Sequence, residues 1–204
     1  MGNSNRLECY IDASFSIHPD GKGHTGMVIM WGGACIMITC RKQKICTKNS
    51  TESELVGVSD SLDEVEWTQD FIESLGHKLS TPILFQDNQS TITIVLEKTT
   101  RRLRTKHMTA RRAVLHEAIV TNKEAEVVYK YTKWMLADPF TKPLEGQGYQ
   151  LLMNVIMGWM TVETVQKLIG PKIVGVRCNK RNTSTVKVPR LTSTVRFQKP
   201  DHVL

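Results

Sequence analysis

Acidic residues stand at four points where the chain passes from one predicted element of secondary structure to the next. They are Asp12, Glu54 with its neighbour Glu52, Asp87 and Asp138. Adjacent carboxylates repel one another unless they are protonated or share a cation. Hard oxygen ligands of this kind suit Mg²⁺ or Mn²⁺. Three or four carboxylates around one point suit a pair of ions about 3.5–4 Å apart, the arrangement used in phosphodiester chemistry.

The aspartates also have structural interpretations. Asp87 could cap the helix that is predicted to follow it, a role that Asp often takes. Asp138 precedes Pro139, as a helix N-cap precedes a proline at the first helical position. Asp12 closes an apolar strand and has no capping role to explain it, so it is the strongest single candidate for chemistry.

The two glutamates compete for one structural role at the start of a long predicted helix. Thr51-x-x-Glu54 and Asn49-x-x-Glu52 both fit a capping box, so we expect one of the two glutamates to be structural. Helical spacing does not choose between them, since either can flank the apolar stripe that begins at Leu55.

The elements that would position these residues alternate between strand and helix patterns. A glycine pair, Gly32-Gly33, favours a two-residue hairpin between two of the strands. The order predicts an α/β fold: a mixed sheet covered by helices, in which an antiparallel half is extended by parallel strands. Parallel neighbours would place Asp12 and Asp87 side by side. Strand patterns occupy residues 6–16, 25–31, 34–40, 82–86 and 125–131, and helix patterns occupy 49–76, a short stretch after Asp87, 104–120 and 135–142.

Length and composition limit the class of protein. The 204 residues suit one domain, or one domain with an appendage, and 40 % are hydrophobic. No apolar run approaches the roughly 20 residues of a membrane span, and the N-terminus lacks the apolar region of a signal peptide. Five cysteines without C-x-x-C spacing argue against a disulfide framework or a zinc site. We therefore expect an intracellular protein with no membrane partner.

The net charge of +7 lies in the C-terminal segment, and the rest of the chain is formally neutral. Residues 171–204 carry eight Lys/Arg against one acidic residue, whereas residues 1–170 hold 19 basic and 19 acidic residues. Within the latter, the stretch RRLRTKHMTARR, residues 101–112, has six Lys/Arg. A solvated helix face and a phosphate-binding patch both remain open for this stretch.

Five motifs in a fixed order resemble one known family. They are YIDASF, KNSTESELVG, LFQDNQSTI, RTKH and YKYTKWMLADPFTKPL. Together, over roughly residues 6–145, they resemble the ribonuclease H domain of copia-type LTR retrotransposon Pol polyproteins. The resemblance implies the ribonuclease H fold, a five-stranded mixed sheet of order 3-2-1-4-5 flanked by helices. It also implies cleavage of the RNA strand of RNA–DNA hybrids with two Mg²⁺ ions, Mn²⁺ being a possible substitute.

The resemblance implies that the catalytic and metal-binding set is Asp12, Glu54, Asp87 and Asp138. Glu54 is preferred to Glu52 because the catalytic glutamate of the family directly precedes Leu or Tyr. By analogy, Asp12 would bridge both ions and Asp138 would help to hold the ion that activates water. Glu54 and Asp87 would hold the ion that faces the leaving 3′-oxygen.

Nucleic-acid contacts are expected from two further stretches. Discrimination of the hybrid should depend on shape and on the ribose 2′-OH. Cellular ribonuclease H has a flexible-loop histidine before the last aspartate that assists catalysis. YTKWMLAD supplies none, and this departure argues against fast turnover but not against metal binding. The residues expected to contact nucleic acid are Asn88, Gln89, Ser90, Arg101, Arg102, Arg104, Lys106 and His107.

The expected organisation is a ribonuclease H-like domain (residues 1–145), a helical extension (146–170) and a basic, flexible tail (171–204). The expected partners are an RNA–DNA hybrid and the reverse transcriptase domain of the same polyprotein. The location would be the cytoplasm, in a virus-like particle, or the nucleus. The competing hypothesis is a degenerate, truncated remnant that binds nucleic acid or a protein without cleavage.

Overall fold

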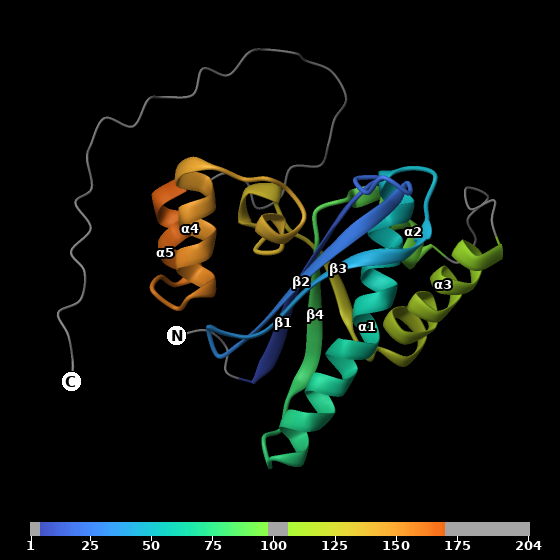
Figure 1. Ribbon diagram of the computed structural model, residues 1–204. Helices are drawn as coiled ribbons and strands as arrows, with labels where there is room; N and C mark the ends of the chain where they lie inside the picture. Colours follow the sequence, from blue (N-terminus) through green and yellow to red (C-terminus); the bar gives the residue numbers. More distant parts are fainter. Residues whose placement is uncertain (1–4, 98–105, 170–204) are drawn as a thin grey trace, which may run out of the picture. The chain divides into compact units, whose positions relative to one another are not determined.

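Five strands form a single mixed sheet in the computed structural model, which describes residues 5–97 and 106–169. The order across the sheet is β3-β2-β1-β4-β5 (Figure 1). This order confirms the fold class that the motifs implied. The strands are β1 (Arg6–Ser14), β2 (Lys22–Trp31), β3 (Ala34–Cys46), β4 (Ser80–Gln86) and β5 (Glu126–Tyr129).

The antiparallel and parallel halves of the sheet meet at β1. β1 pairs antiparallel with β2, and β2 pairs antiparallel with β3. The β2–β3 turn is the predicted Gly32-Gly33 pair, with φ values of 60° and 87° that glycine adopts without strain. β4 joins β1 in parallel and β5 joins β4 in parallel. The helical crossovers that parallel pairing requires are therefore present where the sequence predicted them.

One face of the sheet packs against three helices and a π-helix (Figure 1). The alternating residues Leu7, Cys9 and Ile11 of β1 point into this core, as a two-residue period requires. The predicted basic helix begins outside the described residues, and its end continues beyond the α-helix as a π-helix. These elements are α1 (Ser50–Ser74), α2 (Gln89–Leu96), α3 (Lys106–His116) and the π-helix η1 (Glu117–Asn122).

The other face of the sheet is covered by short helices from the C-terminal part of the described chain. Tyr10, Val28 and Phe85 share a hydrophobic cluster with Leu152 and Val155. The short helix predicted over residues 135–142 is a 3₁₀ turn and not an α-helix. These elements are the 3₁₀ helices η2 (Thr132–Trp134) and η3 (Asp138–Phe140), and the α-helices α4 (Gly146–Ile156) and α5 (Val162–Ile169).

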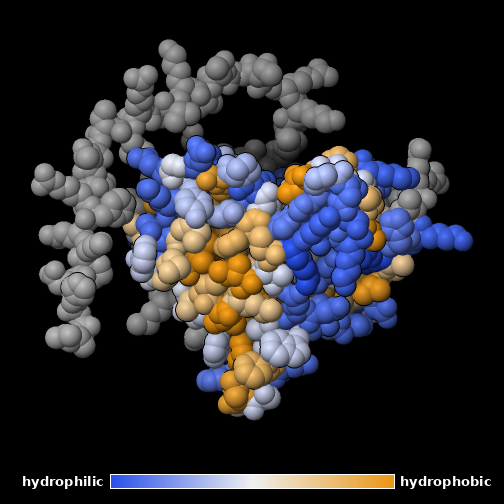
Figure 2. Space-filling view, viewed as in Figure 1, coloured by the Kyte–Doolittle hydropathy of each residue, from blue (hydrophilic) through white to orange (hydrophobic). Residues whose placement is uncertain are grey.

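β3 forms an edge of the sheet and leaves part of its side-chain surface open. Ile36 and Ile38 of this strand are exposed. Figure 2 shows apolar surface gathered in the area that the β2–β3 hairpin occupies in Figure 1, beside a strongly hydrophilic area. Among the described residues, no helix is long and apolar enough to cross a membrane. The predicted tail, residues 171–204, lies outside the described residues.

Candidate metal centre

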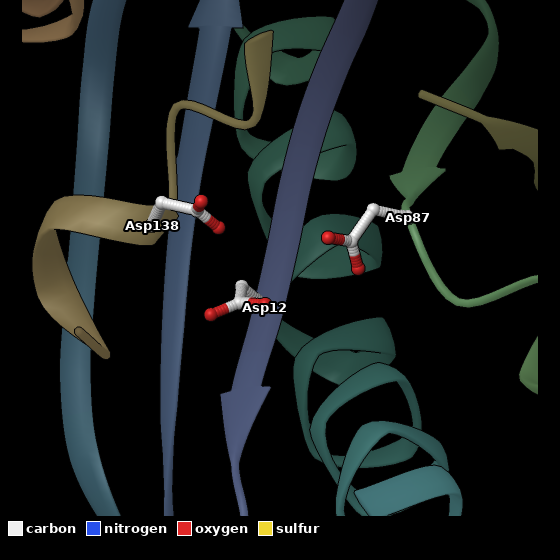
Figure 3. Close-up of side chains that lie close together, drawn as sticks. All are labelled: Asp12, Asp87 and Asp138. Carbon is white, nitrogen blue, oxygen red and sulfur yellow. The ribbon is translucent and has the colours of Figure 1, made fainter. Parts of the chain in front are cut away.

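Three aspartates from three separate elements converge at one point of the sheet. Asp12 comes from β1, Asp87 follows β4 and Asp138 begins η3. One carboxylate oxygen from each lies within 4.8 Å of the others. Figure 3 shows the three carboxylates turned toward a common space, with Asp12 in the middle. The sequence separates these residues by up to 126 positions, so only the fold brings them together.

Asp12 is the most deeply buried of the three, with none of its surface exposed. It lies on the β1 face that carries Tyr10, opposite to the face of Cys9 and Ile11. Both of its carboxylate oxygens accept hydrogen bonds: Oδ2 from the hydroxyl of Thr141, and Oδ1 from the Lys142 ammonium at 3.1 Å. A buried carboxylate is retained only when such partners or a cation compensate its charge.

Asp138 reaches the cluster because η3 packs directly on β2. A Cβ at Gly26 would lie 2.9 Å from Thr141 Cγ2 and 3.1 Å from the Ala137 carbonyl, so only glycine permits this approach. Asp138 makes no capping hydrogen bond, and its carboxylate accepts one from Lys142 at 2.9 Å. The structural interpretation of Asp138 as a helix cap is therefore wrong.

Burial raises the pKa of Asp138 from 3.8 to about 6, and the charges of Asp12 and Asp87 act in the same direction. The hydrogen bond from Lys142 lowers the pKa of Asp138 and opposes these effects. A raised carboxyl pKa at a cluster of acids is the expected consequence of desolvation and like charge. Ionisation of Asp138 is therefore unfavourable beside Asp12 and Asp87, and a bound cation would make it more favourable.

Asp87 does not cap the helix that follows it, because Asn88 takes that role. The Asn88 side chain accepts hydrogen bonds from the backbone N–H groups of Ser90 and Thr91. Asp87 is left to face the cluster, and its Oδ2 accepts a hydrogen bond of 2.8 Å from the Thr132 hydroxyl. The capping interpretation of Asp87 is therefore wrong, and its side chain is available as a ligand.

The capping box at the start of α1 separates the two glutamates. Asn49 accepts a hydrogen bond from the Glu52 N–H, and the Glu52 carboxylate accepts one from the Lys48 N–H, each 2.9 Å long. Glu52 is therefore the structural residue. Glu54 is buried near the aspartates but lies outside their 4.8 Å group. Its pKa is raised well above 4.5, by burial first and then by the charges of Asp12 and Asp87.

Sequence reasoning missed the polar residues that hold these ligands. Gln86 is fully buried, donates to Glu54 at 3.2 Å, and accepts from the Asp87 and Asn88 N–H groups at 2.8 and 3.1 Å. The sequence signal for Gln86 was a polar glutamine at the end of an otherwise apolar strand. Thr132, Thr141 and Lys142 likewise donate hydrogen bonds to the aspartates. Of these three, only Lys142 could have been predicted from the sequence, by its i,i+4 spacing from Asp138.

The residues predicted to contact nucleic acid fall into three groups. Asn88 uses its side-chain oxygen as a cap, while Gln89 and Ser90 are exposed at the start of α2. Lys106 and His107 are exposed at the start of α3. Arg101, Arg102 and Arg104 lie outside the described residues.

The end of the basic stretch has a structural role. Arg111 pairs with Asp60 of α1, and Arg112 is buried and donates to the Ile94 carbonyl of α2. Both arginines tie α3 to its neighbouring helices. Phosphate binding therefore stays a prediction for the first part of the stretch, residues 101–107.

The fold of this chain is similar to that of a solved structure. LC11-RNase H1, isolated from compost, aligns with a TM-score of 0.52 and 14 % identity over 67 % of this chain and 92 % of that one. The chain has the ribonuclease H fold. At this level of identity the likeness concerns the ribonuclease H fold alone. No protein-family model matches the chain.

The sequence is similar to transposon polyproteins of Saccharomyces cerevisiae. The Transposon Ty1-DR5 Gag-Pol polyprotein is 27 % identical over 150 residues, and the Transposon Ty1-JR2 Gag-Pol polyprotein is 28 % identical over 151 residues. Each alignment covers 74 % of this chain and 8 % of the polyprotein. Together with the ribonuclease H fold, this similarity confirms the resemblance that the five motifs indicated.

Proposed function

We propose that this chain is an endoribonuclease that hydrolyses the RNA strand of RNA–DNA hybrids with the help of divalent cations. One observation carries the proposal: three carboxylates on the ribonuclease H fold converge within 4.8 Å, at the junction of β1, β4 and η3. Exposed acidic clusters are common on proteins, whereas two of these three aspartates are buried. Burial is costly for carboxylates unless a cation compensates them.

The donor set supports a hard divalent cation. All the converging atoms are carboxylate oxygens, which Mg²⁺ and Mn²⁺ prefer to softer ligands. Divalent cations supply Lewis-acid stabilisation of the charge that develops on a phosphodiester during hydrolysis. The protein supplies rigidity: Thr141, Thr132 and Gln86 orient Asp12, Asp87 and Glu54 by hydrogen bonds.

The finer assignment uses two Mg²⁺ ions, with Mn²⁺ as a substitute. In this assignment Asp12, which lies between Asp138 and Asp87 (Figure 3), would contribute to holding both ions. Asp138 would help to hold the ion that activates water, and Glu54 and Asp87 would help to hold the ion that faces the leaving 3′-oxygen. Glu54 would complete the set: burial and the charges of Asp12 and Asp87 raise its pKa, and a cation beside it would favour its ionised form.

The proposed substrate is inferred from the proteins to which this chain is similar. One is a ribonuclease H1 and the others are Gag-Pol polyproteins of transposons. We propose that the chain degrades RNA paired with DNA during reverse transcription, next to the reverse transcriptase domain of the same polyprotein. Gln89, Ser90, Lys106 and His107 are exposed and are the candidate contacts among the described residues.

Replacement of Asp12 by Asn tests the proposal. Asn keeps the shape of the side chain but removes the negative charge that a cation needs. We expect Asp12→Asn to abolish cleavage of an end-labelled RNA–DNA hybrid in Mg²⁺ or Mn²⁺, a loss of more than about 100-fold. The measurement is the rate at which labelled RNA fragments form on a denaturing gel.

Asp63→Asn is the matched control, since Asp63 is an exposed aspartate of α1. It should cleave at the wild-type rate. A wild-type chain that binds the hybrid but makes no cut in either metal would contradict the proposal. That result would favour the degenerate remnant that binds without cleavage.

A further inference from the structure

Lys142 places its ammonium group inside the aspartate cluster. Its Nζ lies 3.1 Å from Asp12 Oδ1 and 2.9 Å from Asp138 Oδ1. The two carboxylates are buried, with side-chain exposures of 1 % and 7 %, whereas the lysine side chain is 36 % exposed. A cation of the protein's own chain thus bridges two of the proposed metal ligands.

Lys142 is bonded to carboxylate oxygens of two residues of the proposed metal-ligand set. Asp12 has one oxygen bonded to Lys142 and the other to the Thr141 hydroxyl. A neutral hydroxyl can remain beside a metal-bound carboxylate, because it carries no charge that opposes the ion. An ammonium cannot stay between the same two oxygens, since it would face a divalent cation at close range in a site of low dielectric.

We propose that Lys142 is the internal counter-ion of Asp12 and Asp138 in the metal-free form of the chain, and that a divalent cation must displace it from these two residues to bind. The inference rests on the proposed metal site and adds that Lys142 competes with the metal ion for two of its ligands. It makes Lys142 a tethered competitor that lowers metal affinity while stabilising the metal-free fold.

The position of Lys142 in the chain allows the exchange. The residue follows η3 by two positions, and its flexible four-carbon stem is partly exposed, so the ammonium can leave for solvent. Arg112, by contrast, is buried and fixed between α2 and α3. Thr141 keeps its bond to Asp12 when Lys142 leaves, so the ligand stays oriented.

Titration calorimetry of the full chain with Mn²⁺ and with Mg²⁺ tests the competition. Lys142→Met removes the ammonium and keeps the length of the side chain. Lys42→Met is the matched control, because Lys42 also pairs with an aspartate, Asp20, at 2.8 Å and is 44 % exposed. A hydrogen bond to a charged group contributes about 1.5–3 kcal/mol, so we expect Lys142→Met to bind metal at least about tenfold more tightly than wild type.

Equal metal affinity of wild type and Lys142→Met would overturn the inference and leave the proposed metal site standing. Absence of binding in both would overturn the metal site itself, and the inference with it. Binding by Lys142→Met alone would support the strongest form of the competition. Lys42→Met should match wild type, since it removes a charge that faces a different carboxylate.

Amine labelling of the wild-type chain gives a second readout that needs no variant. An N-hydroxysuccinimide ester reacts with free lysine amines, and mass spectrometry locates the acylated residues. The ion pairs should protect Lys142 in the metal-free chain, and saturating Mg²⁺ should raise its labelling severalfold while that of Lys42 stays constant. Unchanged labelling of Lys142 under conditions where calorimetry records binding would overturn the displacement.

Discussion

The acidic residues of the cluster differ from surface acids in the partners that hold them. Asp12, Asp138 and Glu54 are buried, and each accepts a hydrogen bond from a named side chain: Thr141, Lys142 or Gln86. These donors fix the carboxylates before any ligand arrives. Preorganisation of this kind is what a metal site requires, because ligands must be held within about 0.5 Å of their working positions.

The raised pKa of Asp138 predicts a pH-dependent loading of the site. Its pKa is about 6 in the folded chain against 3.8 as the ordinary value. The folded state therefore binds this proton more tightly than the unfolded state, so the stability of the metal-free chain falls as pH rises between these two values. A metal ion needs the ionised form. We expect the Mn²⁺-induced rise in melting temperature to be small at about pH 5 and full above about pH 7.

Differential scanning fluorimetry of wild type and Asp138→Asn measures the pH dependence of the metal-free stability and of the Mn²⁺-induced rise in melting temperature. The variant cannot titrate at this position, so the difference between the two metal-free melting temperatures should change across this pH range. A difference that stays constant from about pH 4 to pH 7 would show that Asp138 titrates normally.

At the scale of elements, the site depends on how closely η3 approaches the sheet. Gly26 of β2 is the Cα partner of Asp12 and leaves room for the residues that follow Asp138. Gly57 has a similar place on α1, where a Cβ would lie 3.3 Å from Ala13 Cβ. Two glycines thus bring η3 and α1, the elements of Asp138 and Glu54, close to the end of β1.

Gly26→Ala should weaken metal binding although Gly26 is not itself a proposed ligand. The added Cβ would lie 2.9 Å from Thr141 Cγ2 and 3.0 Å from Phe140 Cβ, so η3 must shift. Overpacking of this kind costs about 1–3 kcal/mol. We expect urea unfolding to record that loss of stability, together with weaker Mn²⁺ binding by calorimetry.

Gly148→Ala is the matched control, because a Cβ there meets nothing within 4 Å. Alanine should stabilise α4 by about 0.5–1 kcal/mol and leave Mn²⁺ binding unchanged. If Gly26→Ala kept wild-type stability and affinity, the close approach of η3 would not be what positions Asp138.

At the scale of the whole described chain, the sheet is enclosed by two hydrophobic clusters. α1, α2 and α3 cover one face, and η3, α4 and α5 belong to the cluster on the other. Tyr10 and Phe85, which lie next to the site in sequence, pack in the second cluster with ring centroids 4.8 Å apart. The helices after residue 145 therefore share a core with the strands that carry Asp12 and Asp87.

Removal of α4 and α5 should unfold the chain and not merely shorten it. A chain that ends at residue 145 loses four buried aliphatic side chains of the second cluster, Leu152, Val155, Ile156 and Val165. Each contributes about 1.5–3 kcal/mol, which together approaches the 5–15 kcal/mol of a typical domain. We expect this chain to aggregate or to lack a cooperative thermal transition by circular dichroism.

A chain that ends at residue 170 is the control, since it keeps every described residue. It should melt cooperatively at a temperature close to that of the full chain. A cooperative, monomeric chain ending at residue 145 would instead show that the strands and α1–α3 suffice for folding.

The order of elements could be predicted from the sequence because it depends on local patterns. The period of two in β1, the glycine pair of the hairpin and the apolar stripe of α1 each act over a few residues. The motifs also named Asp12, Glu54, Asp87 and Asp138 as one set. Local pattern was less reliable for 135–142, where a 3₁₀ turn replaces the predicted helix, since three residues cannot establish a helical period.

Only the tertiary structure decided which groups meet. It showed that Asn49 with Glu52 caps α1 and that Asn88 caps α2, which leaves Glu54 and Asp87 free of that role, and it placed Lys142 between Asp12 and Asp138. Local sequence fixes what each segment prefers by itself. The distance between atoms more than a hundred residues apart depends on how the packed sheet and its covering helices fit, and no single segment contains that information.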